Sequence, residues 1–227
     1  MTSLATGLLA GILLVFAGVS ASPGAAAAAE IARPLFWKTG THISPGGATN
    51  GLIMASTRSG EASGFMVLRQ VEIDGIGWLL IRIGRRPNNR VAWVPSEKFL
   101  VSQIDSKIII SVRARTMTMF SGGRKAWVSP VVVGKSSTPT PLGLFAVHDF
   151  YRVKDDLRPW IIETTAHSEA LRTFLGGPAR VAIHGRHGQL RVPWGSAVSN
   201  GCIRAPDWAL RSIRKRAPVG TPIEIRR

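Results

Sequence analysis

The stretch VSPVVVGKSSTPTPLGLF, residues 128–145, decides the fold of the C-terminal half of this 227-residue chain. Its valine-rich opening is typical of a buried strand. Pro139 and Pro141 then occupy alternate positions, where each removes a backbone donor and fixes φ. Because proline is excluded from the interior of a sheet, the Thr-Pro-Thr-Pro run predicts a rigid loop that leads into a further strand at residues 144–147.

Further strands are predicted on both sides of this loop from short runs of β-branched and apolar residues. They are expected at residues 107–112, 116–120, 126–133, 180–183 and 219–225. A helix is predicted to begin at Pro206 and to bury Trp208, Leu210 and Ile213. The segment 148–177 has the least regular pattern, and we expect it to form a lid or a wall over a cleft.

The preceding part of the chain also predicts β structure. Short strands are expected at residues 65–71, 78–83 and 91–94. Asp74 and Gly75 predict a tight turn between the first two of these strands. Short strands at this spacing favour a small barrel. We therefore divide the chain into a small β domain at residues 31–102 and a second domain at residues 104–227.

Residues 1–29 carry no charged side chain, and Glu30 is the first. An apolar run at residues 8–19 is followed by small residues, which is the order of a secretory signal. At about 1.5 Å per residue the run is too short to span a bilayer core of about 30 Å. The segment therefore predicts export, either as a cleaved signal peptide or as an uncleaved membrane anchor.

The charge balance predicts an anionic partner or environment. Lys and Arg number 29 against 13 Asp and Glu, which gives a formal net charge of +16. Nucleic acid, anionic lipid and acidic wall polymers fit this charge equally well. Predicted export, together with the lack of interleaved aromatic and basic residues, argues against nucleic acid. A membrane contact is expected only through the N-terminal segment, if that segment stays uncleaved.

The single cysteine, Cys202, is the strongest candidate for chemistry. One cysteine excludes an intramolecular disulfide and a structural zinc site built from cysteines. A cysteine nucleophile needs a nearby base or cation to form its thiolate, and His184, at the end of a predicted strand, is the best candidate. Two alternatives stay open: a buried, inert cysteine, and a metal pair of His184 with His187 that lacks a third ligand nearby.

The residues around this pair carry a resemblance to a known family. His184-Gly185 followed by Ser-x-Gly-Cys-Ile-Arg at residues 199–204 resembles the L,D-transpeptidase catalytic domain of the YkuD type. The runs at residues 107–123 and 128–145 resemble the opening strands and the Thr-Pro-Thr-Pro signature of that family. The resemblance covers residues 104–227 and implies a mainly β fold, a β-sandwich with a short C-terminal helix.

A second resemblance concerns the preceding domain. The run GWLLIRIGRRPNNRVAWVPSEKF, residues 77–99, resembles bacterial SH3-like domains, with Ala92 where these often have glycine. It implies a small SH3-like β-barrel on the N-terminal side of the catalytic domain. The implied role is wall binding or spacing, and a structural appendage without a ligand is the alternative.

The first resemblance implies acyl transfer on peptidoglycan stem peptides without a metal or an organic cofactor. Cys202 is the implied nucleophile and forms a thioester with the stem, with release of its terminal D-alanine. His184 is the implied general base and acid. The backbone carbonyl of Gly185 is implied to orient the imidazole of His184.

The turn that carries the cysteine supplies the other implied site residues. The backbone N–H groups of Asn200, Gly201 and Cys202 are the expected oxyanion donors. Arg204 and Ser199 are expected to bind substrate, and bracing of the cysteine loop is an equal alternative for Arg204. Asn200 departs from the family, which usually has histidine there, and it cannot carry charge.

These implications converge on an exported acyltransferase of the cell wall or periplasmic space. The expected function is an L,D-transpeptidase that cross-links peptidoglycan, with stem peptides as substrates and anionic wall polymers as surroundings. Two alternatives remain. One is an L,D-carboxypeptidase with the same nucleophile, and the other is a non-catalytic peptidoglycan-binding protein.

Overall fold

The computed structural model describes residues 28–152, 160–174, 176–186 and 192–227. The predicted signal peptide or anchor at residues 1–29 lies almost wholly outside the described residues and stays a prediction. Within the described ranges, no helix is both long enough and apolar enough to cross a membrane.

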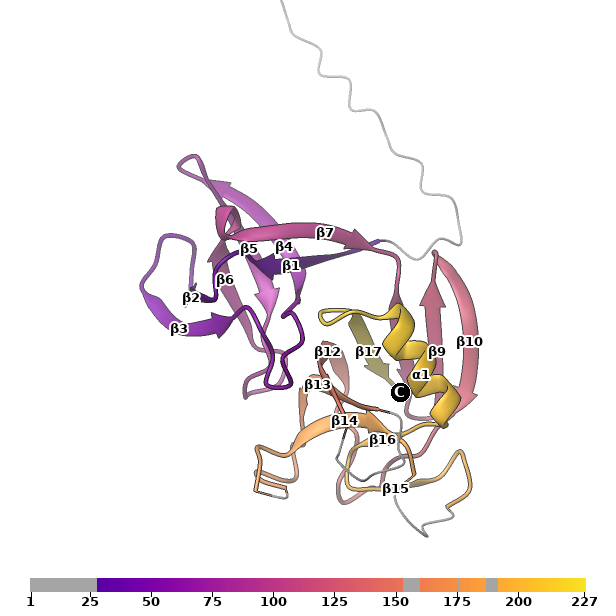
Figure 1. The fold of residues 1–227 in the computed structure, drawn as a ribbon. Coiled ribbons are helices and arrows are strands. Elements are labelled where there is room, and N and C mark those ends of the chain that lie inside the picture. The colour runs from indigo at the N-terminus through magenta and orange to yellow at the C-terminus, as the bar shows by residue number, and fades with distance from the viewer. Residues whose placement is uncertain (1–27, 153–159, 175, 187–191) are drawn as a thin grey trace, which may run out of the picture.

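The N-terminal part of the described chain is a seven-stranded antiparallel sheet with its own core (Figure 1). Its elements are β1 (Ala29–Pro34), β2 (Lys38–His42), β3 (Thr49–Met54), β4 (Phe65–Ile73), β5 (Ile76–Arg82), β6 (Val91–Pro95), the short 3₁₀ helix η1 (Ser96–Lys98) and β7 (Phe99–Ile104). The strands pair in the order β3-β2-β6-β5-β4-β1-β7. Leu79, Ile81 and Val94 belong to one buried cluster there. The SH3-like assignment of this sheet stays a prediction.

The tight turn predicted between two of these strands is confirmed. β4 and β5 are joined at Asp74 and Gly75, whose φ angles are 52° and 73°. A two-residue hairpin of this twist needs positive φ at both central positions, which an Asp-Gly pair tolerates. The turn thereby sets the β4–β5 register, in which Ile73 pairs with Ile76.

The C-terminal part is an eight-stranded sheet, a two-stranded sheet and one helix. Its elements are β8 (Lys107–Ser111), β9 (Thr116–Ser121), β10 (Arg124–Pro130), β11 (Val133–Gly134), β12 (Gly143–Tyr151), β13 (Ile161–His167), β14 (Arg180–His184), β15 (Ala197–Ser199), β16 (Ile203–Arg204), α1 (Asp207–Arg216) and β17 (Pro222–Arg226). The large sheet has the order β10-β9-β8-β17-β12-β13-β14-β16, and β11 pairs with β15. The mainly β fold with one short C-terminal helix is therefore confirmed.

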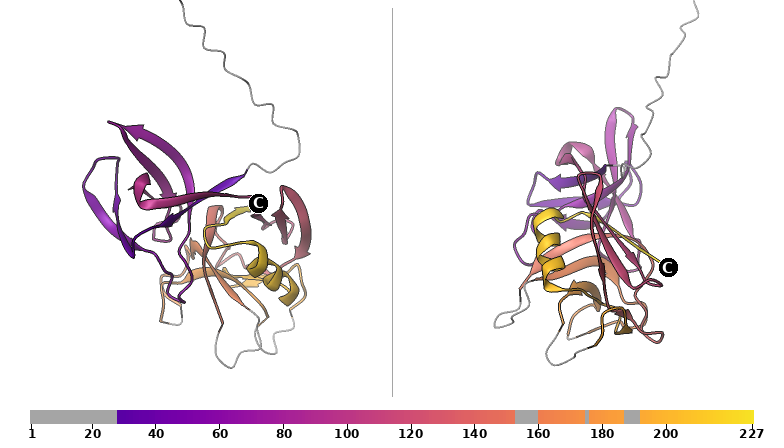
Figure 2. Two further views of the ribbon diagram at one scale, coloured as in Figure 1. Left: turned by 45° about the horizontal axis from the view of Figure 1, so that its top comes forward. Right: turned by 90° about the vertical axis from the view of Figure 1, so that its right-hand side faces the viewer.

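One hydrophobic core holds this sheet and the helix together. Met117 of β9, Phe145 of β12 and Ile183 of β14 belong to the same buried cluster, although their strands lie far apart in the sheet order. The sheet must therefore bend around the core, and α1 packs into it through Leu210 and Ile213 (Figure 2). This arrangement of two β layers over one core is the sandwich that the sequence predicted.

Two details of the sequence prediction are wrong. Trp208 was expected on the buried side of the helix, but it is 48% exposed and packs edge-on against the ring of Trp127 on β10. The residue after it, Ala209, takes the buried position because a helix turns by 3.6 residues. The segment 148–177 contains β13, an inner strand of the large sheet, where a lid or wall was expected. The β-branched residues of Ile161–His167 were the signal for that strand.

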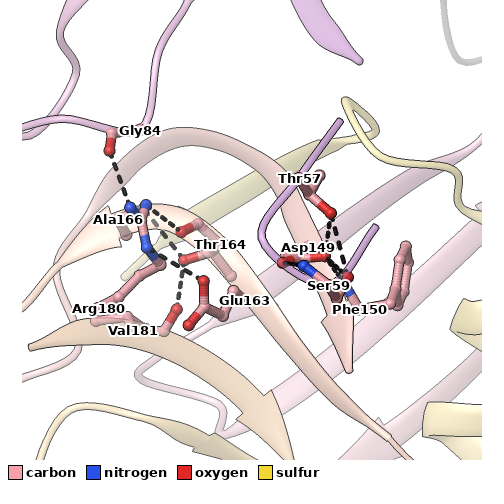
Figure 3. A network of polar contacts seen from close by, with 10 residues as sticks. All are labelled: Thr57, Ser59, Gly84, Asp149, Phe150, Glu163, Thr164, Ala166, Arg180 and Val181. Carbon is pink, nitrogen blue, oxygen red and sulfur yellow. Dashed lines mark hydrogen bonds and ion pairs between the residues drawn. The ribbon is translucent and has the colours of Figure 1, made fainter. Parts of the chain in front are cut away.

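The N-terminal sheet contacts the C-terminal unit on the side of β12 and β13. The carboxylate of Asp149, on β12, is 3% exposed and accepts hydrogen bonds from Thr57 Oγ1 at 2.7 Å and from the backbone N–H of Ser59 at 3.1 Å (Figure 3). The hydroxyl of Ser59 donates to the same carboxylate. The buried carboxylate of Asp149 therefore fixes the loop between β3 and β4 to the eight-stranded sheet.

Further contacts extend this interface along the edge of β13 and β14. The guanidinium of Arg86 donates to the carbonyl oxygens of Ser168 and Leu171 at 2.8 and 2.7 Å. Asn88 and His167 exchange two hydrogen bonds of 2.8 Å. Charge-assisted and paired bonds of this kind limit movement between the two parts more than apolar contact alone.

We expect Asp149→Asn to lower the free energy of unfolding by about 1.5–3 kcal/mol, because the substitution removes the charge that several donors share. Thermal or urea unfolding monitored by tryptophan fluorescence measures this loss. Glu72→Gln, at an exposed position on β4, is the control and should change stability little. Equal effects of the two substitutions would contradict the role given to Asp149.

Candidate active site

The parallel pairing of β14 with β16 brings the candidate nucleophile and base to neighbouring strands. Ile183 pairs with Ile203 and His184 with Arg204, so Cys202, just before β16, lies level with Ala182. Neighbouring strands are about 4.8 Å apart and residues rise about 3.3 Å, which puts the Cα atoms of Cys202 and His184 roughly 8 Å apart. Side chains of cysteine and histidine can meet across that separation.

The two candidate side chains leave the same face of the sheet. Ile183 and Ile203 are fully buried in the core, and side chains alternate along a strand, so His184 and Arg204 project from the opposite face. His184 and Cys202 are both half-buried, so solvent reaches them. The Nδ1 atom of His184 lies 2.7 Å from the carbonyl oxygen of Gly185, the contact that the resemblance implied. That contact makes Nδ1 the donor and leaves Nε2 as the basic nitrogen.

The turn before the cysteine has a backbone that only glycine adopts readily. Gly201 has a φ of 108°, and a Cβ atom at this residue would lie 3.4 Å from the carbonyl oxygen of Pro139. A side chain would fit the space but would be strained by the positive φ. The backbone conformation of the turn is therefore the physical reason for glycine at this position.

The Thr-Pro-Thr-Pro loop fixes the same turn. The hydroxyl of Thr138 donates to the carbonyl oxygen of Ser199 at 3.1 Å, and that of Thr140 donates to the carbonyl oxygen of Gly201 at 2.9 Å. Thr140 Oγ1 also accepts from the backbone N–H of Gly134 at 2.9 Å. The rigid loop predicted from its prolines is thus the support of the cysteine turn, a role that the sequence analysis did not assign.

Ser199 supports this turn from inside. It is 1% exposed, its hydroxyl donates to the carbonyl oxygen of Cys202 at 2.6 Å, and it accepts from the backbone N–H of Gly201 at 3.2 Å. In the free protein this hydroxyl satisfies the backbone of the turn, and a substrate-binding role of Ser199 stays a prediction. The Gly201 amide, expected as an oxyanion donor, is engaged by that hydroxyl in the free protein.

Two further predicted site residues, Asn200 and Arg204, are less buried than Ser199. Asn200 is exposed, and Arg204 is half-buried on β16. The backbone N–H and carbonyl of Arg204 bond to Val132 at 2.9 Å each, while its backbone neighbour Ala205 donates to the carbonyl oxygen of His184. Arg204 is thereby fixed beside the histidine. His187, the second member of the alternative metal pair, lies outside the described residues.

The electrostatics of Cys202 explain why it needs a base. Burial raises the pKa of its thiol above the ordinary value. A hydrogen bond from the backbone N–H of Ala182 and the positive charge of Arg204 lower the pKa, and the carboxylate of Glu163 raises it. The sulfur is therefore held as a thiol unless a neighbouring group removes its proton, and the imidazole of His184 is the group positioned for that transfer.

Ala182 and Glu163 are neighbours of Cys202 that sequence reasoning missed. Ala182 acts through its backbone, which no residue type reveals. Glu163 lies on the strand that the sequence analysis described as irregular, and only the pairing of β13 with β14 brings it near the site. The β-branched residues of Ile161–His167 were the available signal for that strand.

The site holds a half-buried thiol near an oriented imidazole, and neighbouring hydroxyls fix the turn that carries the thiol. This arrangement is typical of proteins that use a cysteine nucleophile for acyl transfer. The model of the L,D-transpeptidase catalytic domain, the YkuD family, matches residues 105–225. The chain belongs to this family.

Three known proteins illustrate what this chain is similar to. YkuD of Bacillus subtilis is 28% identical over 127 residues, which are 53% of this chain and 65% of that protein, so the chain spans less than two thirds of this relative. An L,D-transpeptidase of Mycobacterium tuberculosis superimposes with a TM-score of 0.44 and 15% identity, over 71% of this chain and 98% of its own. The catalytic domain of an L,D-transpeptidase of E. faecium gives 0.38 and 21%, over 53% and 96%.

We expect His184→Gln to slow the alkylation of Cys202 by iodoacetamide at pH 7 by about tenfold or more, because only the thiolate reacts. Without the base, the half-maximal rate should lie at a higher pH than for an exposed cysteine, since burial raises the pKa of this thiol. Intact-mass spectrometry against time measures the rate. His42→Gln, on β2, is the histidine control and should react as the parent does. An unchanged rate in His184→Gln would remove this histidine from the site.

Proposed function

We propose that this protein is an exported cysteine L,D-transpeptidase that acts on peptidoglycan tetrapeptide stems and forms cross-links in the cell wall. The observation that supports this most is the β14–β16 register, which sets Cys202 beside Ala182 and next to His184 in a chain of the L,D-transpeptidase family. Export and residence in the cell wall or periplasmic space are supported by the apolar run at residues 8–19 and by the net charge of +16.

In the first half of the proposed reaction, Nε2 of His184 takes the proton of the Cys202 thiol. The thiolate attacks the carbonyl carbon between the third residue of the stem and its terminal D-alanine. The developing oxyanion faces the backbone N–H groups at residues 200–202, and the Gly201 amide must exchange its bond to Ser199 Oγ for one to the oxyanion. His184 then returns the proton to the leaving amine, and a thioester on Cys202 remains.

In the second half, an amine of a neighbouring stem attacks the thioester carbon and the C–S bond breaks. A carboxypeptidase uses water for this step, and it is the alternative that shares every residue named so far. A non-catalytic wall-binding protein is the other alternative, and Asn200 in place of the family histidine is the feature that favours it. The base role falls on His184 and not on the residue at position 200, which supports the enzyme.

Acylation by a carbapenem tests the nucleophile. We expect one covalent adduct per chain in the parent, none in Cys202→Ala, and an unchanged adduct in the control His42→Gln, because the chain has a single cysteine. Intact-mass spectrometry after incubation detects the adduct. An adduct that persists in Cys202→Ala, or a parent that forms none, argues for the non-catalytic alternative.

The acceptor decides between the two enzymes. We expect stem tetrapeptides incubated with the parent to release D-alanine and to give peptide dimers when an acceptor amine is present. Liquid chromatography with mass spectrometry separates dimers from the tripeptide that hydrolysis leaves. Tripeptide alone, at every acceptor concentration, would assign the protein as a carboxypeptidase.

A further inference from the structure

A row of four residues crosses the sheet from the nucleophile towards the N-terminal part of the chain. Asp149 on β12 pairs with Glu163 on β13, Glu163 pairs with Ala182 on β14, and Ala182 lies level with Cys202. At about 4.8 Å per strand, the Cα atom of Glu163 is roughly 10 Å from that of Cys202. The residue between them in this row is Ala182, whose side chain is a single methyl group.

The two carboxylates of the row differ in what they contact. Asp149 is occupied by the donors of Thr57 and Ser59 and by the backbone N–H of Phe150 at 2.8 Å (Figure 3). Glu163 is engaged through one oxygen, Oε2, which lies 3.3 Å from Nε of Arg180. Among the contacts of the described residues, its other oxygen accepts no hydrogen bond, and its side chain is 28% exposed. Glu163 therefore keeps an accessible oxygen on the face of the nucleophile.

Arg180 holds this carboxylate in place. Its guanidinium donates to the carbonyl oxygen of Thr164 at 3.2 Å and to that of Gly84, in the N-terminal part, at 3.1 Å (Figure 3). Because the two Nη groups are bound to fixed backbone oxygens, Nε points at Glu163 from a fixed position. A carboxylate held at one oxygen and open at the other is arranged to receive a second cation.

We propose that Glu163 is the binding group for the acceptor amine that resolves the acyl-enzyme on Cys202. This inference rests on the proposed transpeptidase function and names a residue that selects its second substrate. The chemistry fits because a primary amine is an ammonium ion near neutral pH and cannot attack until it loses a proton. A carboxylate one small residue away from the thioester both attracts the ammonium and accepts that proton.

The attack of the amine on the thioester moves two protons and replaces a C–S bond by a C–N bond. The ammonium gives one proton to Glu163, and the free amine attacks the thioester carbon. The C–S bond breaks as the new C–N bond forms, and the second proton of the attacking nitrogen passes to the neutral imidazole of His184. The products are the amide, the Cys202 thiolate with its imidazolium partner, and a protonated Glu163 that releases its proton to water.

The charges around Glu163 favour this role. Burial raises the pKa of its carboxyl group, and Asp149 raises it further, while Arg180 and the exposed Arg58 lower it. The net direction is upward, which makes the carboxylate a better proton acceptor than an exposed glutamate. The Arg58 charge comes from the β3–β4 loop that Asp149 holds, so the N-terminal part contributes to this environment.

Glu163→Gln tests the proposal in the active enzyme. We expect the KM for the acceptor amine, measured by dimer formation, to rise by about tenfold. The rate of carbapenem acylation should not fall, because the substitution removes a charge that raises the pKa of the Cys202 thiol. The acylation assay contains no amine, so it reports the donor half alone. Glu224→Gln is the matched control, because Glu224 is also a part-exposed glutamate held by an ion pair, to Lys107 at 2.7 Å.

A binding measurement in Cys202→Ala makes the test independent of turnover. The probe is a stem tetrapeptide with a free side-chain amine, compared with the same peptide acetylated at that amine, by isothermal titration calorimetry. We expect the free amine to bind about tenfold more tightly than the acetylated form, and this preference to vanish when Glu163→Gln is added. Glu163→Asp keeps the charge and should retain part of the preference, which decides the matter if the glutamine variant fails to fold.

The outcomes separate the two proposals. If the parent forms no acyl-enzyme, the transpeptidase function fails, and the binding experiment still decides on Glu163. If the free-amine preference persists in Glu163→Gln, or if carbapenem acylation falls as much as dimer formation, Glu163 is a structural ion-pair partner of Arg180 and the proposal is overturned.

Discussion

The parallel pairing of β14 with β16 is the constraint on which the site depends. Two short strands that are separated by a loop in the sequence pair there, and the buried isoleucines at 183 and 203 fix the register. A slip of one residue would send both isoleucines to the solvent face and turn His184 and Arg204 into the core. The hydrophobic core thereby sets the catalytic geometry: the burial of two apolar side chains determines which face the thiol and the imidazole share.

The Thr-Pro-Thr-Pro loop supplies the second half of that constraint. A parallel pair of two-residue length is too short to hold a tight turn by itself, and the turn before Cys202 has its backbone in a conformation that favours glycine. Because proline lacks a backbone N–H, the loop does not pair as a strand. Its two threonine hydroxyls donate instead to the carbonyl oxygens of Ser199 and Gly201. The buried carbonyl of Gly201 finds its partner in Thr140, while that of Ser199 also accepts from the backbone N–H of Lys135 at 3.0 Å, and these bonds fix the turn.

The sequence predicted those features that depend on local chemistry. The Asp74-Gly75 turn and the short C-terminal helix each follow from a few neighbouring residues, and the structure has both. Long-range pairing was harder to predict. β13 reads as irregular because its polar residues Glu163 and Thr164 face partners from other strands. The burial of Ser199 likewise depends on the fold of the whole turn. No local pattern states where a strand lies in a sheet.

The same reasoning explains why the N-terminal sheet belongs to any account of this site. A carboxylate as buried as Asp149 is costly without donors, and the β3–β4 loop supplies them in the hydroxyl and amide groups of residues 57 and 59. Arg180 likewise needs the carbonyl oxygen of Gly84 to hold its guanidinium against Glu163. The polar face of β12–β14 is therefore complete only with the N-terminal sheet in contact. Ala182 separates Glu163 from Cys202 in this row, and the Glu163 charge still acts on the pKa of the Cys202 thiol. The contact between the two parts of the chain therefore contributes to the electrostatic surroundings of the nucleophile.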